Sequence, residues 1–152
     1  MKLYEMTYGI VGLGIMGGSL AKSIRTNILS MSNATGRILA CNRSSASLEM
    51  AKSEGVIDEG FTSDCVEQMI PQCDLIYVCL YPGATLEFLK KYRNLFKSGA
   101  IITDISGVKN IFEKENMKSF NITKNDANQR LDKFVQKAAP KLPNGLMYKY
   151  IR

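Results

Sequence analysis

The chain has 152 residues, of which 45% are hydrophobic and 22% charged, and this is the composition of one globular domain with a buried core. It excludes a disordered chain, a collagen and a disulfide scaffold, and no apolar run approaches the roughly 18 residues of a membrane span. Because the N-terminus leads into a glycine-rich motif and not into a signal peptide, a cytoplasmic protein without membrane contact is expected.

Charge and reactive side chains are unevenly distributed. Residues 1–116 hold 12 Lys+Arg and 12 Asp+Glu, whereas residues 117–152 hold 8 Lys+Arg and two acidic residues, so the net charge of +6 lies in the C-terminal part. A basic segment of this kind indicates either nucleic-acid binding or solvated basic helices.

The four cysteines lack the spacing of metal ligands, and the sequence around three of them favours buried free thiols. The chain has no histidine. No metal site is expected.

Residues 1–116 alternate short apolar runs with amphipathic stretches, which predicts an α/β fold with a doubly wound parallel sheet. The expected strand and helix pairs are Tyr8–Leu13 with Ser19–Ile28, Ile38–Cys41 with Ser45–Glu54, Leu75–Leu80 with Thr85–Phe96, and Ile101–Asp104 with Asn110–Glu115. A short strand near Val56 or Phe61 and a short helix over Asp64–Met69 are expected between the second and third pairs.

Residues 117–152 have a different pattern. Asn128–Ala139 is predicted to be helical, two prolines and a glycine follow over 140–145, and another helix is expected over Leu146–Arg152. No Gly/Ser-rich linker separates the two parts. The chain is therefore expected to consist of a domain over residues 1–116 and a short α-helical segment over residues 117–152.

The sequence Gly12-Leu13-Gly14-Ile15-Met16-Gly17 follows the first expected strand and opens a helix, which is the context of a Rossmann-like dinucleotide-binding loop. Gly12 is expected to permit a tight turn, Gly14 to let the backbone approach a pyrophosphate, and Gly17 to let helix and strand pack closely. The N–H groups of this loop, including those of Ile15 and Met16, would face the anion. The alternative is a glycine-rich turn without a ligand.

The end of the second expected strand discriminates between nicotinamide cofactors. An NAD site usually has Asp or Glu there, whereas the 2′-phosphate of NADP needs hydrogen-bond donors. Here the residues are Asn42, Arg43, Ser44 and Ser45. Arg43 can pair with the phosphate and stack on the adenine, while Asn42, Ser44 and Ser45 can donate hydrogen bonds. NADP is therefore favoured over NAD, and one of the serines is also expected to cap the next helix.

Two more loops are expected at the same edge of the sheet. Tyr81-Pro82-Gly83 follows one strand, and Asp104-Ile105-Ser106-Gly107-Val108-Lys109 follows another. Loops at the carboxyl ends of strands bind ligands in open α/β sheets, although such short sequences also form ordinary turns. Tyr81 and Pro82 are therefore candidate cofactor-binding residues.

The first part of the chain resembles the N-terminal half of prephenate dehydrogenases. The resemblance covers about Tyr8 to Asn116, and the segments that carry it are Gly9–Ala21, Asp74–Ile76, Tyr81-Pro82 and Thr103–Lys109. It implies NAD(P)-dependent oxidative decarboxylation of prephenate to 4-hydroxyphenylpyruvate, a step of tyrosine and aromatic amino acid biosynthesis. In the family, a histidine of a later Gly-His-Pro motif polarises the substrate hydroxyl, and a helical domain binds the substrate carboxylates.

The sequence departs from this family at two points that bear on activity. It has no histidine and no second helical domain, and Gly107 stands where the family places a serine. Ser106 and Lys109 remain as candidate catalytic residues by resemblance. We therefore expect an oxidoreductase domain that binds the cofactor without useful turnover, because acid–base assistance and substrate positioning are missing.

The second part resembles the start of a large-subunit-type pseudouridine synthase that begins at Met117. The segments that carry this resemblance are Met117–Thr123, Asn128–Phe134 and Leu146–Arg152. It implies part of a helical RNA-binding module, and the basic residues that match are Arg130, Lys133, Lys149 and Arg152. Only weak RNA contact is expected, because the strands that complete the module and the catalytic aspartate motif are absent.

Three interpretations of the whole chain stay open at this point. The first is the NADP-binding domain of a prephenate dehydrogenase. The second is an RNA-binding module fused to a nucleotide-binding domain. The third is a truncated, chimeric gene remnant that has no function as a unit.

Overall fold

The computed structural model describes residues 2–105, and these residues form a five-stranded parallel sheet. The strands are β1 (Thr7–Val11), β2 (Arg37–Asn42), β3 (Glu59–Thr62), β4 (Leu75–Val78) and β5 (Ile101–Asp104). Their order in the sheet is β3-β2-β1-β4-β5, and every neighbouring pair is parallel. The direction of winding changes between β1 and β4, so the expected doubly wound sheet is confirmed.

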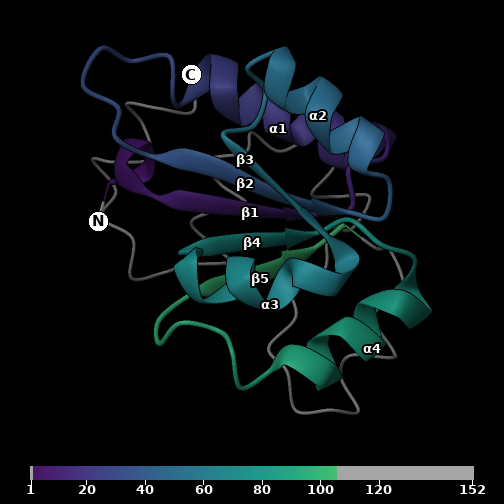
Figure 1. The fold of residues 1–152 in the computed structure, drawn as a ribbon. Coiled ribbons are helices and arrows are strands. Elements are labelled where there is room, and N and C mark those ends of the chain that lie inside the picture. Colours follow the sequence, from purple (N-terminus) through teal and green to yellow (C-terminus); the bar gives the residue numbers. More distant parts are fainter. Residues whose placement is uncertain (1, 106–152) are drawn as a thin grey trace, which may run out of the picture. The chain divides into compact units, whose positions relative to one another are not determined.

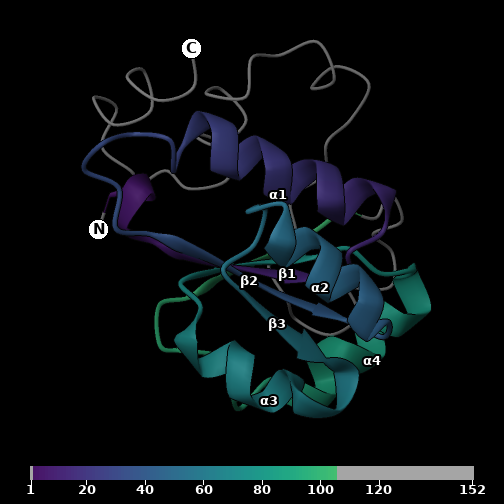
Figure 2. The same cartoon turned by 45° about the horizontal axis from the view of Figure 1, so that its top comes forward.

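Helices cover both faces of this sheet. Helices α1 (Ile15–Asn27) and α2 (Ser45–Ser53) lie on one face, and α3 (Val66–Met69) and α4 (Pro82–Tyr92) lie on the other (Figures 1 and 2). Single turns of 3-10 helix occur at Leu3–Glu5, Ser63–Cys65 and Ile70–Gln72. This distribution follows from the change of winding, because parallel crossovers are almost always right-handed.

Two helices begin earlier than the apolar pattern predicts. Helix α1 starts at Ile15 and not at Ser19, because Gly14 is its N-cap and the intervening residues continue the turn. Helix α4 starts at Pro82 and not at Thr85. Proline is favoured at the first helical position, since its fixed φ suits a helix and its missing N–H is not needed there.

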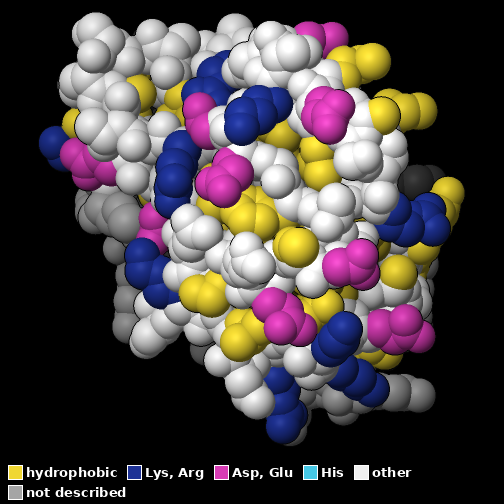
Figure 3. Space-filling model, in the orientation of Figure 1, with side chains coloured by type: hydrophobic (Ala, Val, Ile, Leu, Met, Phe, Trp, Pro, Cys, Tyr) yellow, Lys and Arg dark blue, Asp and Glu magenta, His cyan; other side chains and the backbone are white. Residues whose placement is uncertain are grey.

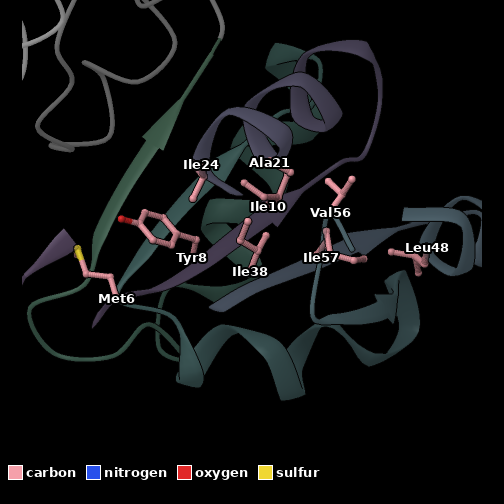
Figure 4. Close-up of a cluster of buried hydrophobic side chains, with 10 residues drawn as sticks. Met6, Tyr8, Ile10, Ala21, Ile24, Ile38, Leu48, Val56 and Ile57 are labelled. Atoms are coloured by element: carbon pink, nitrogen blue, oxygen red, sulfur yellow. The ribbon is translucent and has the colours of Figure 1, made fainter. Parts of the chain in front are cut away.

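The main core lies between the sheet and helices α1 and α2 (Figure 4). Its buried members are Met6, Tyr8, Ile10, Ala21, Ile24, Ile38, Ala40, Leu48, Val56 and Ile57. Each fully buried aliphatic side chain contributes about 1.5–3 kcal/mol through the hydrophobic effect. The one hydroxyl in this core, that of Tyr8, donates a hydrogen bond of 2.7 Å to Leu3 O.

The other face of the sheet packs against α3 and the turn after it, where Met69, Ile70 and Cys73 are buried. All four cysteines are free thiols; Cys41 and Cys73 are buried as expected, whereas the other two are partly exposed. Over residues 2–105, no cluster of Cys, Asp or Glu is suited to a metal ion. No helix in the same range has the length and apolarity to cross a bilayer.

Asp74 joins three strands at their amino ends. Its Oδ2 accepts a hydrogen bond of 2.9 Å from the Thr7 N–H of β1, and its Oδ1 lies 2.5 Å from Lys97 Nζ. The Ile101 N–H of β5 donates to Asp74 O at 2.9 Å. Burial by itself would raise the pKa of Asp74, but the hydrogen bonds from Lys97 and Thr7 hold the pKa below its usual value.

Acidic and basic side chains are mixed on the face shown in Figure 3, where neither sign forms a continuous field. Residues 2–105 carry equal numbers of both. The basic excess of the sequence belongs to residues 117–152, which lie outside the described residues, as do the helices expected over 110–115, 128–139 and 146–152.

Candidate functional site

The glycine-rich loop begins where β1 ends. Gly12 has φ +99°, which is a left-handed conformation that L side chains rarely adopt. A Cβ at this position would also lie 2.7 Å from Cys79 O of the neighbouring chain segment. The Gly12 N–H donates a hydrogen bond of 2.8 Å to Cys41 O, so the turn is held between the ends of β2 and β4. The geometry is the tight turn that the sequence predicts.

Gly17 brings helix α1 against this turn. A Cβ on Gly17 would lie 1.9 Å from Gly12 O and 3.2 Å from Ile10 Cγ2. Real Cβ atoms do not come so close to a backbone oxygen, so only glycine fits here. The close packing of helix and strand predicted for Gly17 is therefore present.

Gly14 lies between these two glycines, and its surroundings are open. It is the N-cap of α1, and a Cβ built on it would have no heavy atom within 4 Å. The Gly18 N–H donates to Gly14 O at 2.8 Å, so the N–H groups of residues 15–17, which come before it in the helix, have no intrahelical acceptor. These N–H groups carry the positive end of the helix dipole. The space beside Gly14 can therefore admit an anion up to the backbone.

The end of β4 forms the second side of the site. The Cys79 N–H donates to Val11 O at 2.7 Å, and the Leu80 Cδ2 atom lies 3.1 Å from the Cβ position of Gly12. The chain then turns at Tyr81, the N-cap of α4, into Pro82. The glycine loop and this turn thus adjoin at the point where strand order reverses, which is where open α/β sheets bind their ligands.

Exposed apolar side chains gather after the carboxyl ends of the strands. Ile15 is 89% exposed, Met16 61% and Tyr81 88%, and Ile105 after β5 is 39% exposed. They are four of the six large hydrophobic residues that are exposed within residues 2–105. Large exposed apolar side chains at the edge where α/β sheets bind their ligands are suited to contact with a ligand. A ligand with flat apolar rings and an anionic centre would match both this edge and the helix terminus.

The end of β2 presents polar side chains next to the glycine loop. Asn42 is the last residue of β2 and is half-buried, and Arg43 is exposed. Ser44 is the N-cap of α2, since its Oγ accepts a hydrogen bond of 3.4 Å from the Ser47 N–H. Its own O–H can still donate. Residues 42–45 include no carboxylate, so the tip offers donors and one positive charge.

Several sequence-predicted site residues are not placed. Ser106 and Lys109, which are the candidate catalytic residues, lie outside the described residues, and so do the four candidate RNA-binding residues Arg130, Lys133, Lys149 and Arg152. In contrast, Thr85 was not predicted, although it is fully buried directly behind the β4–α4 turn. The sequence signal that could have identified Thr85 is a hydroxyl residue one helical turn after the N-cap position of α4.

A scan against models of protein families identifies one family. The family model described as "Prephenate dehydrogenase, nucleotide-binding domain" matches residues 23–125, which extends past the expected boundary at residue 116. No curated protein sequence matches the chain.

Solved structures of dehydrogenases are similar to this chain. One is prephenate dehydrogenase from A. aeolicus in complex with hydroxyphenyl propionate and NAD+, with 30% identity and a TM-score of 0.58 over 72% of this chain and 39% of that one. Another structure of the Aquifex aeolicus prephenate dehydrogenase has 31% identity and a TM-score of 0.57, covering 75% and 40%. Synechocystis arogenate dehydrogenase, at 23% identity and a TM-score of 0.58 over 70% and 38%, shares the fold. The chain thus spans about 40% of the length of the Aquifex aeolicus chains.

Proposed function

This chain belongs to the prephenate dehydrogenase family, whose nucleotide-binding domain it contains, and on that premise we propose that it binds a nicotinamide dinucleotide beyond the carboxyl ends of β1 and β4, where the strand order reverses. The observation that carries the proposal is Gly14: it is the one glycine of the motif with open space at its Cβ position, and it lies at the start of α1. A pyrophosphate bound there would accept hydrogen bonds from backbone N–H groups. The exposed ring of Tyr81 and the exposed side chains of Ile15 and Met16 would then cover apolar parts of the dinucleotide.

We further propose that NADP is preferred over NAD. Arg43 is exposed at the tip of β2, next in the chain to Ser44 and Asn42, and residues 42–45 include no carboxylate that could bind the ribose. An arginine and a phosphate form strong, often bidentate hydrogen bonds. The A. aeolicus structure is a complex with NAD+, so the preference rests on residues 42–45 of this chain and not on the family.

The reaction proposed for the family site is oxidation of prephenate by hydride transfer to the nicotinamide, which the cofactor supplies when it is bound. The 152 residues contain no histidine, so they provide no imidazole to assist the substrate hydroxyl. We propose that they bind the cofactor without oxidising prephenate by themselves. Arogenate is the other substrate to be tested, because an arogenate dehydrogenase has the same fold. RNA binding is not proposed, since no described residue supports it.

Calorimetric titration of the 152-residue chain with NADPH and with NADH tests both proposals. We expect tighter binding of NADPH, and we expect Arg43→Ala to weaken NADPH binding about tenfold while leaving NADH binding nearly unchanged. Arg93→Ala is the matched control, because it removes another exposed arginine, which lies at the C-terminal end of α4. Equal affinities for the two cofactors would refute the NADP preference, and no binding of either would refute the function.

Turnover is measured separately. The chain is mixed with NADP and either prephenate or arogenate, and formation of the reduced nicotinamide is followed by absorbance. We expect no reduction above the enzyme-free rate. A rate comparable to that of a full-length dehydrogenase would show that these residues contain a complete catalytic site.

A further inference from the structure

Thr85 is one of two polar residues that are buried within residues 2–105, and its side chain is completely inaccessible. The other is Asp74, at the amino ends of the strands. A buried hydroxyl costs free energy unless it is hydrogen-bonded, so its partners show what it stabilises.

Both hydrogen-bond donors of Thr85 point at the turn between β4 and α4. The side-chain hydroxyl donates to Leu80 O at 3.3 Å, and the backbone N–H donates to Tyr81 O at 2.9 Å. Pro82 follows these two carbonyls and fixes the backbone where the helix begins. Thr85 therefore holds two consecutive carbonyls of the turn from inside the protein.

This turn is in contact with the glycine loop and presents its outer side chain to solvent. Cys79 O lies 2.7 Å and Leu80 Cδ2 3.1 Å from the Cβ position of Gly12. Tyr81 is 88% exposed, so its ring makes few contacts that could fix it. The place of Tyr81 at this edge of the sheet is consequently set by its backbone, and the backbone is held by Thr85.

We propose that Thr85 is a positioning residue for cofactor binding, whose buried hydroxyl fixes the β4–α4 turn so that Leu80 and Tyr81 form a preformed wall of the dinucleotide site. This inference rests on the proposed function, since it assumes that the dinucleotide binds beside this turn. A preformed wall binds more tightly than a mobile one, because less conformational freedom is lost when the ligand binds.

The test compares Thr85→Val with Thr85→Ser in the full chain by calorimetric titration with NADPH. Valine keeps the shape of threonine and loses the hydroxyl, whereas serine keeps the hydroxyl. We expect Thr85→Val to weaken NADPH binding about three- to tenfold, which is the effect of one lost hydrogen bond, and Thr85→Ser to stay near wild type. If the valine variant does not fold, Thr85→Ala provides the same deletion of the hydroxyl.

Asp74→Asn is the control for general destabilisation, because it removes the charge of the other buried polar residue at the opposite edge. It should lower the melting temperature without changing NADPH affinity. A double-mutant cycle with Tyr81→Ala adds a specific measurement: if Thr85 acts through Tyr81, then Thr85→Val should cost less affinity in the Tyr81→Ala background than in the wild type.

The outcomes separate the two proposals. A wild-type chain that binds neither NADPH nor NADH would overturn the proposed function together with this inference. If a folded Thr85→Val variant binds NADPH as tightly as the wild-type chain does, only the role of Thr85 is overturned. The role of Thr85 would also be overturned if Thr85→Val and Asp74→Asn each lost NADPH affinity in proportion to the fall in their melting temperature.

Discussion

Two alanine substitutions, Gly14→Ala and Gly17→Ala, should have opposite effects although the residues are three apart in the same loop. At Gly17 the new Cβ would lie 1.9 Å from Gly12 O, a backbone atom of a turn that is hydrogen-bonded to its neighbour. Helix α1 would have to move by about 1 Å to restore contact distance in a close-packed interior. At Gly14 the same methyl group would meet no heavy atom within 4 Å.

The expected magnitudes follow from these surroundings. Overpacking costs about 1–3 kcal/mol, and Gly17→Ala should reach the upper end because the obstacle is backbone and not a flexible side chain. For a domain of this size that corresponds to a melting temperature lower by about 10 °C or more. Gly14 has φ −78°, which alanine adopts without strain, so Gly14→Ala should cost less than about 1 kcal/mol, mainly from poorer N-capping.

At temperatures where both variants are folded, the loss of cofactor affinity should be larger for Gly14→Ala than for Gly17→Ala, which reverses the order of their effects on stability. Gly14→Ala should weaken NADPH binding at least tenfold, because its methyl group occupies the space through which the pyrophosphate approaches the backbone. Gly14→Val should abolish binding altogether and keep the wild-type circular dichroism spectrum. Thermal melting and calorimetric titration of the same samples check both effects. Unchanged affinity in Gly14→Val, or equal melting temperatures for the two alanine variants, would refute the assignment of separate roles to these glycines.

Two further predictions concern titratable groups. Because hydrogen bonds lower the folded-state pKa of Asp74, its carboxylate stabilises the fold above an unfolded-state pKa of about 4 and ceases to do so as the pH falls through the folded-state pKa. Asp74→Asn should therefore cost about 2 kcal/mol at neutral pH and flatten the acid side of the stability profile measured by urea unfolding; an unaltered profile would contradict this. Burial raises the pKa of three thiols, to about 11 for Cys41 and Cys79 and to about 12 for Cys73. The buried thiols of Cys41 and Cys73 should resist alkylation at neutral pH until the chain unfolds, as mass spectrometry after iodoacetamide treatment can show, and rapid modification of Cys73 in the folded chain would contradict its burial.

The order of strands and helices was readable from the sequence because each element satisfies a local rule. Apolar runs of four to six residues predicted the strands, and the glycine motif after the first of them predicted both the turn at Gly12 and the close packing at Gly17. Ser44 or Ser45 was expected to cap α2, and such local signals act within a few residues. Within residues 2–105 only the exact ends differed, as at Pro82, where helix and loop signals overlap.

The sequence predicted that these loops share one edge of the sheet, and only the tertiary structure decided which of their residues touch. The sequence could not show that Cys79 and Leu80 lie against Gly12, because this contact depends on β4 pairing with β1 across more than 60 residues. The sequence assigned different roles to Gly14 and Gly17, but only the structure shows that a Cβ has room at Gly14 and none at Gly17. Only the structure, too, reveals that the hydroxyl of Thr85 is buried behind the turn that carries Tyr81. Local propensity is a property of neighbouring residues, whereas a binding crevice is made by the packing of distant ones.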